Sequence, residues 1–132
     1  MSAFAARGIN TYRQAEVQSR TPLELVVMLY DGALRFTRDA KEAIVQGDIR
    51  RRSEAVSRAM AIVSQLQSTL DMDAGGDVAL SLDQLYGFAH DRLLDASLRQ
   101  DVRPLDEVLA MLTNLRDAWS DISAREARPV AK

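Results

Sequence analysis

The chain lacks cysteine and is poor in proline and glycine, with three prolines and six glycines among 132 residues. Without cysteine it can form neither a disulfide framework nor a thiolate metal site, and the absence fits a reducing compartment. Its apolar runs are too short to span a bilayer, and its N-terminus has neither a signal-peptide nor an anchor pattern. We therefore expect a soluble cytoplasmic protein with one domain, since this length is sufficient for a single core.

Positive and negative charges are nearly balanced. The chain has 17 Lys and Arg residues and 19 Asp and Glu residues, for a formal net charge of −2. No global field would then draw the chain onto nucleic acid or anionic lipid. The one basic run, Arg50-Arg51-Arg52, is interpreted as a solvated helix face, since no aromatic residues interleave with it as stacking platforms. The sequence therefore predicts neither a nucleic-acid partner nor membrane insertion.

The side-chain combinations that enzymes need are also missing. His90 is the only histidine, so no Ser-His-Asp constellation is evident and no Glu-x-x-His pair supports a di-iron site. Gly75 and Gly76 form a turn signal without the pattern of a phosphate-binding loop. The sequence predicts a protein that is not an enzyme and has no metal or cofactor, with His90 as a structural or surface residue.

Long segments with helical periodicity, and no strand-like alternation, predict an all-α chain. Thr21, Pro22 and Glu24 form a capping box with proline at the first helical position, which marks the start of the first helix. Gly47 is placed to end that helix, and Asp48 to cap the next one. The expected helices span residues 22–46, 49–70, 78–99 and 104–124.

Four helices of similar length with short connections predict an antiparallel four-helix bundle with an N-terminal arm. Residues 21–124 would form the bundle, residues 1–20 a flexible arm, and residues 125–132 a frayed tail. The second, third and fourth helices each have one apolar stripe for the core. These stripes are Val56, Ala59, Met60, Val63, Leu66 and Leu70; Val78, Leu82, Leu85, Tyr86, Ala89, Leu93 and Ala96; and Leu105, Val108, Leu112, Leu115, Trp119 and Ile122.

The first helix differs because it has two apolar stripes, rotated by about 120° from each other. The core stripe consists of Leu25, Val26, Leu29, Ala33, Phe36, Ala40 and Ile44. The second stripe consists of Leu23, Val27, Tyr30 and Leu34. The third helix repeats the feature weakly, since Leu80, Gly87, Leu94 and Leu98 lie opposite its core face. Gly87 is unfavourable in mid-helix, which suggests a close helix approach at that position.

Three explanations could account for the second stripe of the first helix. The bundle could be asymmetric, with this helix more central than its neighbours. The N-terminal arm could dock there through Ile9 and Tyr12. An amphipathic helix of a partner could also lie in a groove along the stripe. The last two explanations are compatible, because an arm can cover a groove until a partner replaces it.

Several segments resemble a known family in their order along the chain, from about residue 8 to residue 123. They are "GINTY", "TPLELVVMLYDGALRF", "MAIVSQLQSTLD", "LYGFAHDRLLDAS" and "LDEVLAMLTNLRDAWSDI". Together they resemble the flagellar secretion chaperones that escort flagellin. The resemblance implies a four-helix bundle in the cytosol of a flagellated bacterium.

The resemblance also implies the ligand, which is the C-terminal helical segment of flagellin wrapped around the bundle. Binding would prevent premature polymerisation and deliver flagellin to the flagellar type III secretion apparatus, with other flagellar regulators and export-gate components as further partners. Ile9 and Tyr12 match family positions that cover or complete the binding surface. Periodicity adds six contact candidates, which are Leu23, Val27, Tyr30, Leu34, Leu94 and Leu98. The alternative is a helical-bundle adaptor that self-associates through the same apolar stripe.

Val27→Asp is the variant that tests the second stripe. If the stripe receives a partner, the variant should weaken cargo binding in a calorimetric titration while circular dichroism shows unchanged helicity. Unfolding of the variant would instead place the stripe in the core.

Overall fold

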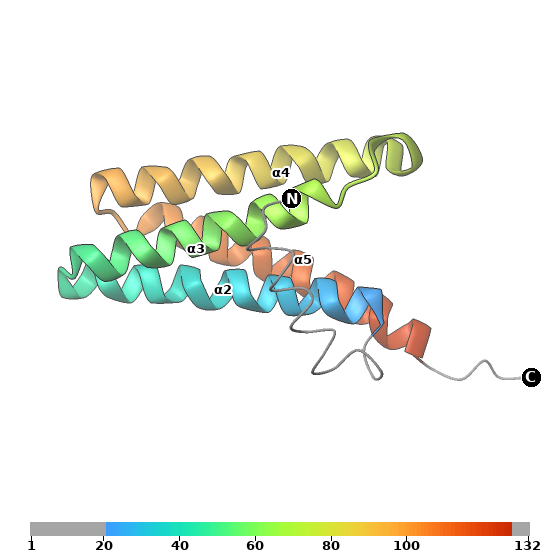
Figure 1. Cartoon of the computed structure of the whole chain (residues 1–132), viewed down its shortest axis with the longest axis horizontal. Helices are drawn as coiled ribbons and strands as arrows, with labels where there is room; N and C mark the ends of the chain where they lie inside the picture. The colour runs from blue at the N-terminus through green and yellow to red at the C-terminus, as the bar shows by residue number, and fades with distance from the viewer. Residues whose placement is uncertain (1–20, 128–132) are drawn as a thin grey trace, which may run out of the picture.

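The structure, a computed structural model, describes residues 21–127, and in this range it contains four helices and no strand. They are α2 (Pro22–Gln46), α3 (Ile49–Ser68), α4 (Met72–Arg99) and α5 (Arg103–Ala127), shown in Figure 1. The predicted all-α four-helix bundle is confirmed. The predicted arm at residues 1–20 lies outside the described residues. Helix α5 continues past its expected end at residue 124.

The predicted helix caps of α2 and α3 are confirmed. The hydroxyl of Thr21 accepts a hydrogen bond from the backbone N–H of Glu24 at 3.1 Å. Gly47 ends α2 in the left-handed region, with φ of 71°, where a side chain would be unfavourable. The carboxylate of Asp48 accepts from the backbone N–H of Arg51 at 3.1 Å and so starts α3. These local bonds explain why both boundaries could be predicted from sequence.

Helix α4 begins earlier than the sequence pattern predicts. The carboxylate of Asp71 accepts hydrogen bonds from the backbone N–H groups of Asp73 and Ala74, which starts a helical turn. Gly76 then interrupts the helix with φ of 53° and ψ of −129°. The expected break is therefore a kink within α4, since glycine adopts this backbone conformation at little cost.

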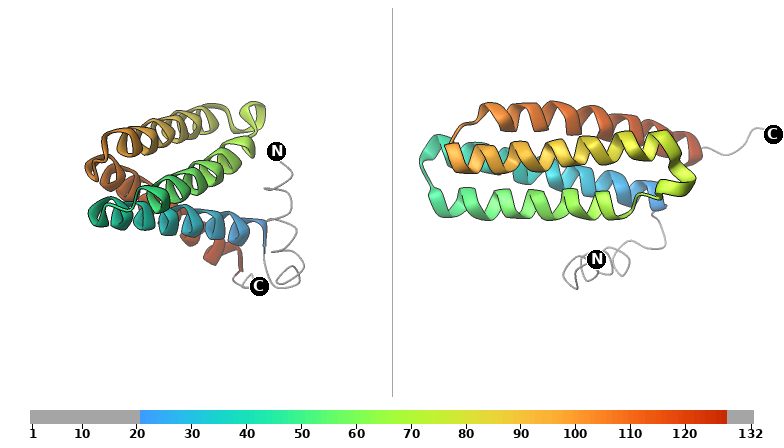
Figure 2. Two further views of the ribbon diagram at one scale, coloured as in Figure 1. Left: turned by 60° about the vertical axis from the view of Figure 1, so that its left-hand side comes forward. Right: turned by 90° about the horizontal axis from the view of Figure 1, so that it is seen from above.

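The four helices form a closed ring in which α2 packs most extensively, against α3 on one side and α5 on the other. Helix α4 completes the ring through less extensive contacts with the same two helices. Helices α2 and α4 therefore occupy diagonal positions, and Figure 2 shows the four helices side by side along the bundle axis. This asymmetry determines how much apolar surface each helix buries.

Most predicted core positions are buried or packed against the core, but three are exposed. Val78 and Leu85 of α4 and Ile122 of α5 were expected in the core, and this prediction is wrong. The buried strip of α4 is narrow and rich in alanine, because α4 has the smaller contacts with its neighbours. Its buried residues are Ala79, Tyr86, Ala89, Leu93 and Ala96.

The basic run at the start of α3 is only in part a solvated face. Arg51 donates from Nε to the Asp39 carboxylate at 2.8 Å, and its Nη2 lies 3.2 Å from a carboxylate oxygen of Glu42. It therefore joins the start of α3 to the last turns of α2. Arg50 pairs only with Glu54 of its own helix, at 3.3 Å.

An aromatic cluster of the buried Tyr30 and Tyr86 and the half-buried Trp119 connects α2, α4 and α5. The hydroxyls of Tyr30 and Tyr86 form a hydrogen bond with each other, and the indole N–H of Trp119 donates to the Tyr30 hydroxyl at 3.2 Å. Burial raises the pKa of both tyrosine hydroxyls, so both stay neutral. The hydroxyl of Tyr30 is thus the shared partner of two other polar groups inside the bundle.

Tyr30→Phe should lower the free energy of unfolding by about 1–3 kcal/mol, because the Trp119 indole N–H and the Tyr86 hydroxyl would both lose their partner. Urea unfolding followed by Trp119 fluorescence measures this change. Tyr86→Phe is the matched variant, and its effect should be smaller because the bond between Trp119 and Tyr30 remains. Equal stability of Tyr30→Phe and the wild type would contradict the role of this cluster.

Candidate partner-binding surface

The second apolar stripe of α2 belongs largely to the bundle core. Tyr30 is 0% exposed and Leu34 is 4% exposed, so their interpretation as surface contacts is wrong. Leu23 and Val27, in the first turns of the helix, are half-buried. The stripe therefore changes from partly accessible to fully buried along α2.

The position of α2 between two neighbours explains why it needs two stripes. Lys41 and Asp31 of α2 pair with Asp106 and Arg116 of α5, at 2.7 and 2.8 Å. Tyr30 contacts α5 through the hydrogen bond from Trp119. The second stripe thus packs towards α5, which is the asymmetric arrangement considered among the three explanations. Val27 lies in the half-buried part of this stripe, so Val27→Asp still separates the two outcomes given above.

The predicted contact residues Leu94 and Leu98 lie on an exposed apolar face of α4. Leu94 is 48% exposed and Leu98 is 75% exposed. Leu80 is exposed on the same side of the helix, two turns before Gly87. We call these four residues, Leu80, Gly87, Leu94 and Leu98, the α4 face. Ile9 and Tyr12, which are also predicted contacts, lie outside the described residues.

Gly87 leaves the middle of the α4 face open. A Cβ atom added at Gly87 would meet no atom within 4 Å among the described residues. The close helix approach expected from the sequence is therefore absent in this part of the chain. Instead, the glycine leaves a notch, an open position on the helix surface between Leu80 and Leu94.

The exposed apolar surface of α4 extends beyond the α4 face. Phe88 is exposed beside it, and Leu85 and Val78 follow on the flank that turns towards α5. The guanidinium of Arg92 lies over the Phe88 ring, 5.5 Å from its centroid, and 3.7 Å from the carboxylate of Glu107. Phe88 was not among the predicted contacts, although its spacing from Leu85 and Val78 at helical period was a usable signal.

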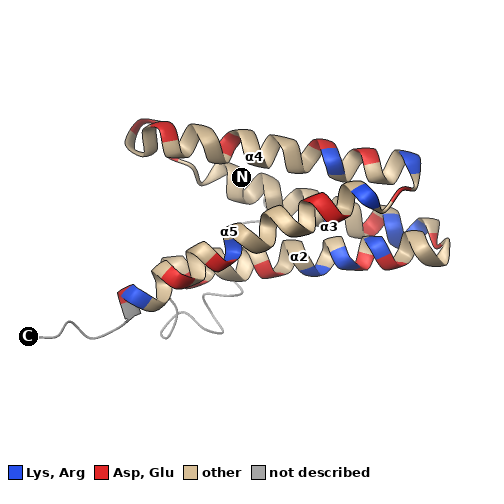
Figure 3. Ribbon diagram, turned by 180° about the vertical axis from the view of Figure 1, so that it is seen from behind, with Lys and Arg blue, Asp and Glu red and all other residues tan. Residues whose placement is uncertain are grey.

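Few charged residues interrupt the exposed apolar surface of α4. Between residues 78 and 90 only Asp83 carries a charge, and its carboxylate accepts a hydrogen bond from Gln67 at 2.7 Å. Figure 3 shows this middle part of α4 between charged residues near the two ends of the helix. An apolar, weakly charged and partly notched helix face can bury the apolar stripe of another helix. It supplies no nucleophile or general base.

His90 stays a structural residue in the described part of the chain. Its Nε2 lies 3.1 Å from the Ser64 hydroxyl of α3, and burial lowers the pKa of the imidazole. Within residues 21–127, no three His, Cys, Asp or Glu side chains cluster in a way that could hold a metal ion. None of the helices in that range combines the length and apolar character needed to cross a bilayer.

Known proteins similar to this chain share most of its length. The family described as flagellar protein FliS matches residues 5–126. The flagellar secretion chaperone FliS of Salmonella typhimurium is 37% identical over 127 residues, covering 92% of this chain and 94% of the relative. The protein of the same name from Bacillus subtilis is 34% identical over 117 residues, covering 89% and 86%. That from Campylobacter jejuni is 37% identical over 117 residues, covering 89% and 91%.

Gly87→Ala tests whether the notch is open in the free protein. The variant should raise the free energy of unfolding by about 0.5–1 kcal/mol, because alanine restricts the unfolded chain and meets no atom in the fold. Urea unfolding with Trp119 fluorescence measures the change. A loss of stability would mean that another segment or a second copy already contacts Gly87.

Proposed function

Because this chain belongs to the flagellar protein FliS family, we propose that it is a cytosolic export chaperone that binds the C-terminal helical segment of flagellin. Binding keeps flagellin from polymerising early and delivers it to the flagellar type III secretion apparatus. The family match over residues 5–126 is the observation that carries the proposal. The relatives named flagellar secretion chaperones, which the chain covers over most of their length, support it further.

The α4 face is where we place the cargo contact. Leu98 is 75% exposed and Leu94 and Leu80 are each 48% exposed, and the open position at Gly87 continues the same face. Burial of apolar surface contributes about 25 cal/mol per Å². An amphipathic cargo helix would therefore gain most of its affinity from these residues and from the neighbouring Phe88.

Two further parts of the surface complete the proposed site. Leu23 and Val27 are half-buried at the start of α2, and they remain candidates for contact with an edge of the cargo. Ile9 and Tyr12 remain candidates by family resemblance. Tyr30 and Leu34 are not proposed as contacts, because the core already covers them. Their role is to support the surface from below.

Masking is the proposed mechanism. A flagellin segment that is disordered alone would associate with another flagellin through its apolar face. Binding to the bundle would cover that apolar face instead. Ordering of the segment on binding costs about 2–5 kcal/mol or more of the interaction energy. The affinity is therefore moderate for the size of the interface, which suits a cargo that must be released at the export apparatus.

The exposed α4 face also supports a second candidate, a bundle that self-associates through this face as an adaptor. Contiguous exposed apolar surface is unusual on a free monomer, and a second copy would cover it. Sedimentation at increasing concentration separates the two candidates. A stable dimer without any partner would favour the adaptor, and a monomer would favour the chaperone.

The double variant Leu94→Asp/Leu98→Asp should weaken binding of the flagellin C-terminal peptide by about tenfold or more, because it removes apolar contact and would bury two carboxylates. Calorimetric titration with the peptide from the same organism measures the affinity. The wild type should show a large negative heat-capacity change on binding, which reports burial of apolar surface.

The control for this experiment is Val45→Asp, which places a carboxylate at another exposed apolar residue, near the end of α2. This variant should bind the peptide like the wild type. If both variants bind normally, flagellin is still the cargo but the α4 face is not its site. If the wild type does not bind the peptide, the proposed function itself is wrong.

A further inference from the structure

Most of the arginines without an ionic partner lie on two helices of the described bundle, α2 and α3. Lys41 and six arginines form ion pairs with carboxylates. Five further arginines form no ion pair within residues 21–127. They are Arg35 and Arg38 of α2, Arg52 and Arg58 of α3, and Arg125 of α5. Carboxylates without an ion pair in that range are spread more widely, and include Asp77 and Asp91 of α4 and Glu24 of α2.

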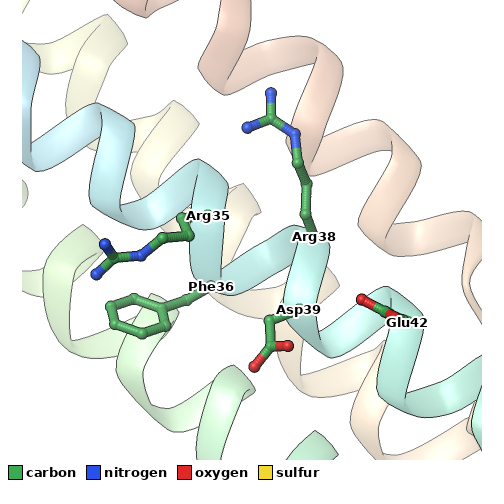
Figure 4. Close-up of a pocket in the computed structure, with 5 residues that line it drawn as sticks. All are labelled: Arg35, Phe36, Arg38, Asp39 and Glu42. Carbon is green, nitrogen blue, oxygen red and sulfur yellow. The ribbon is translucent and has the colours of Figure 1, made fainter.

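Two of these arginines lie over the same aromatic ring. The guanidinium carbon of Arg35 lies 4.9 Å from the centroid of the Phe36 ring, and that of Arg58, from α3, lies 5.6 Å from it. Figure 4 shows Arg35 beside the ring and Arg38 extending from another side of α2. The basic groups therefore continue from α3 across the outer surface of α2. We call Arg35, Phe36, Arg38 and Arg58 the arginine face.

The arginine face borders a cleft of about 360 Å³ that is lined by α2 residues. Asp39 and Glu42 also line this cleft, but their carboxylates already bind Arg51, at 2.8 and 3.2 Å. They are therefore not the counter-ions of Arg35 or Arg38. Like charges that neighbour each other on a helix repel when no counter-ion is present, so a carboxylate ligand would relieve this repulsion.

We propose that the arginine face binds an acidic peptide segment of a partner protein. Guanidinium groups present planar pairs of N–H donors that match carboxylates, so Arg35, Arg38 and Arg58 would each pair with a carboxylate of the segment. The half-buried ring of Phe36 offers apolar contact to a side chain between those carboxylates. The segment would lie across α2, from the α3 side towards the α5 side.

This surface is separate from the proposed cargo site. Helices α2 and α4 occupy diagonal positions in the ring, so their outer surfaces point in opposite directions. A partner on the arginine face would not displace a helix bound to the α4 face. The protein could then carry its cargo and be recognised by a second, acidic protein at the same time. The inference goes beyond cargo binding and does not depend on what the cargo is.

The test uses the full chain and a short fluorescein-labelled peptide of alternating glutamate and phenylalanine, with fluorescence anisotropy at low salt. The combined variant Arg35→Gln/Arg38→Gln/Arg58→Gln should bind the peptide about tenfold more weakly than the wild type, since charge-assisted hydrogen bonds are lost. The matched control, Arg99→Gln/Arg103→Gln/Arg125→Gln, removes the same charge from other helices and should bind like the wild type. Added salt should weaken wild-type binding.

Three results would overturn the proposal. Equal weakening in both triple variants would show that only net charge matters. Equal binding of a peptide with glutamine in place of glutamate would exclude the carboxylates as the recognised groups. Tighter binding of a single-stranded oligouridine to the arginine face would identify a nucleic-acid surface instead. The variant Leu94→Asp/Leu98→Asp should bind the acidic peptide normally, which separates this test from that of the cargo site.

Discussion

The hydroxyl of Tyr30 accepts a hydrogen bond from the indole N–H of Trp119 and forms another with the hydroxyl of Tyr86. One buried oxygen thus connects α2, α5 and α4. A buried polar group without a partner costs about 1–3 kcal/mol, so an arrangement of these helices that broke either bond would be less stable. Apolar side chains of all four helices then pack around this cluster. The rotation of α4 about its axis, and with it the direction of its exposed face, depends on Tyr86 being held there.

The unequal packing of the ring determines where binding surfaces remain. Helix α2 is covered by α3 and α5, so even its second apolar stripe is used inside the bundle at Tyr30 and Leu34. Helix α4 meets the same two neighbours over a smaller area and buries mainly alanines. Leu94 and Leu98 therefore keep much of their apolar surface exposed in the described part of the chain. A helix that contributes least to the core is the one most free to bind another molecule.

The two proposed surfaces use different physical interactions. The α4 face is apolar with few charges, so it would hold a cargo by burial of apolar area, which is not directional and tolerates sequence changes in the cargo. The arginine face would recognise carboxylates through oriented donors, which depends on geometry and on salt. Asp39 and Glu42 form ion pairs with Arg51, so they do not neutralise the positive charge of the arginine face. Separate chemistry on opposite sides allows the two partners to be selected independently.

The sequence by itself determined the helices and their caps, because bonds such as that from the Glu24 N–H to Thr21, and the left-handed backbone at Gly47, involve near neighbours. It also determined the family, through the order of its apolar segments. It could not decide whether an apolar stripe lies in the core or on the surface. Periodicity shows on which side of its helix the Tyr30 side chain lies, but it does not show whether another helix covers that side. Only the tertiary structure, with α2 between two neighbours and α4 at the diagonal, decided that Tyr30 is core and that Leu94 is exposed.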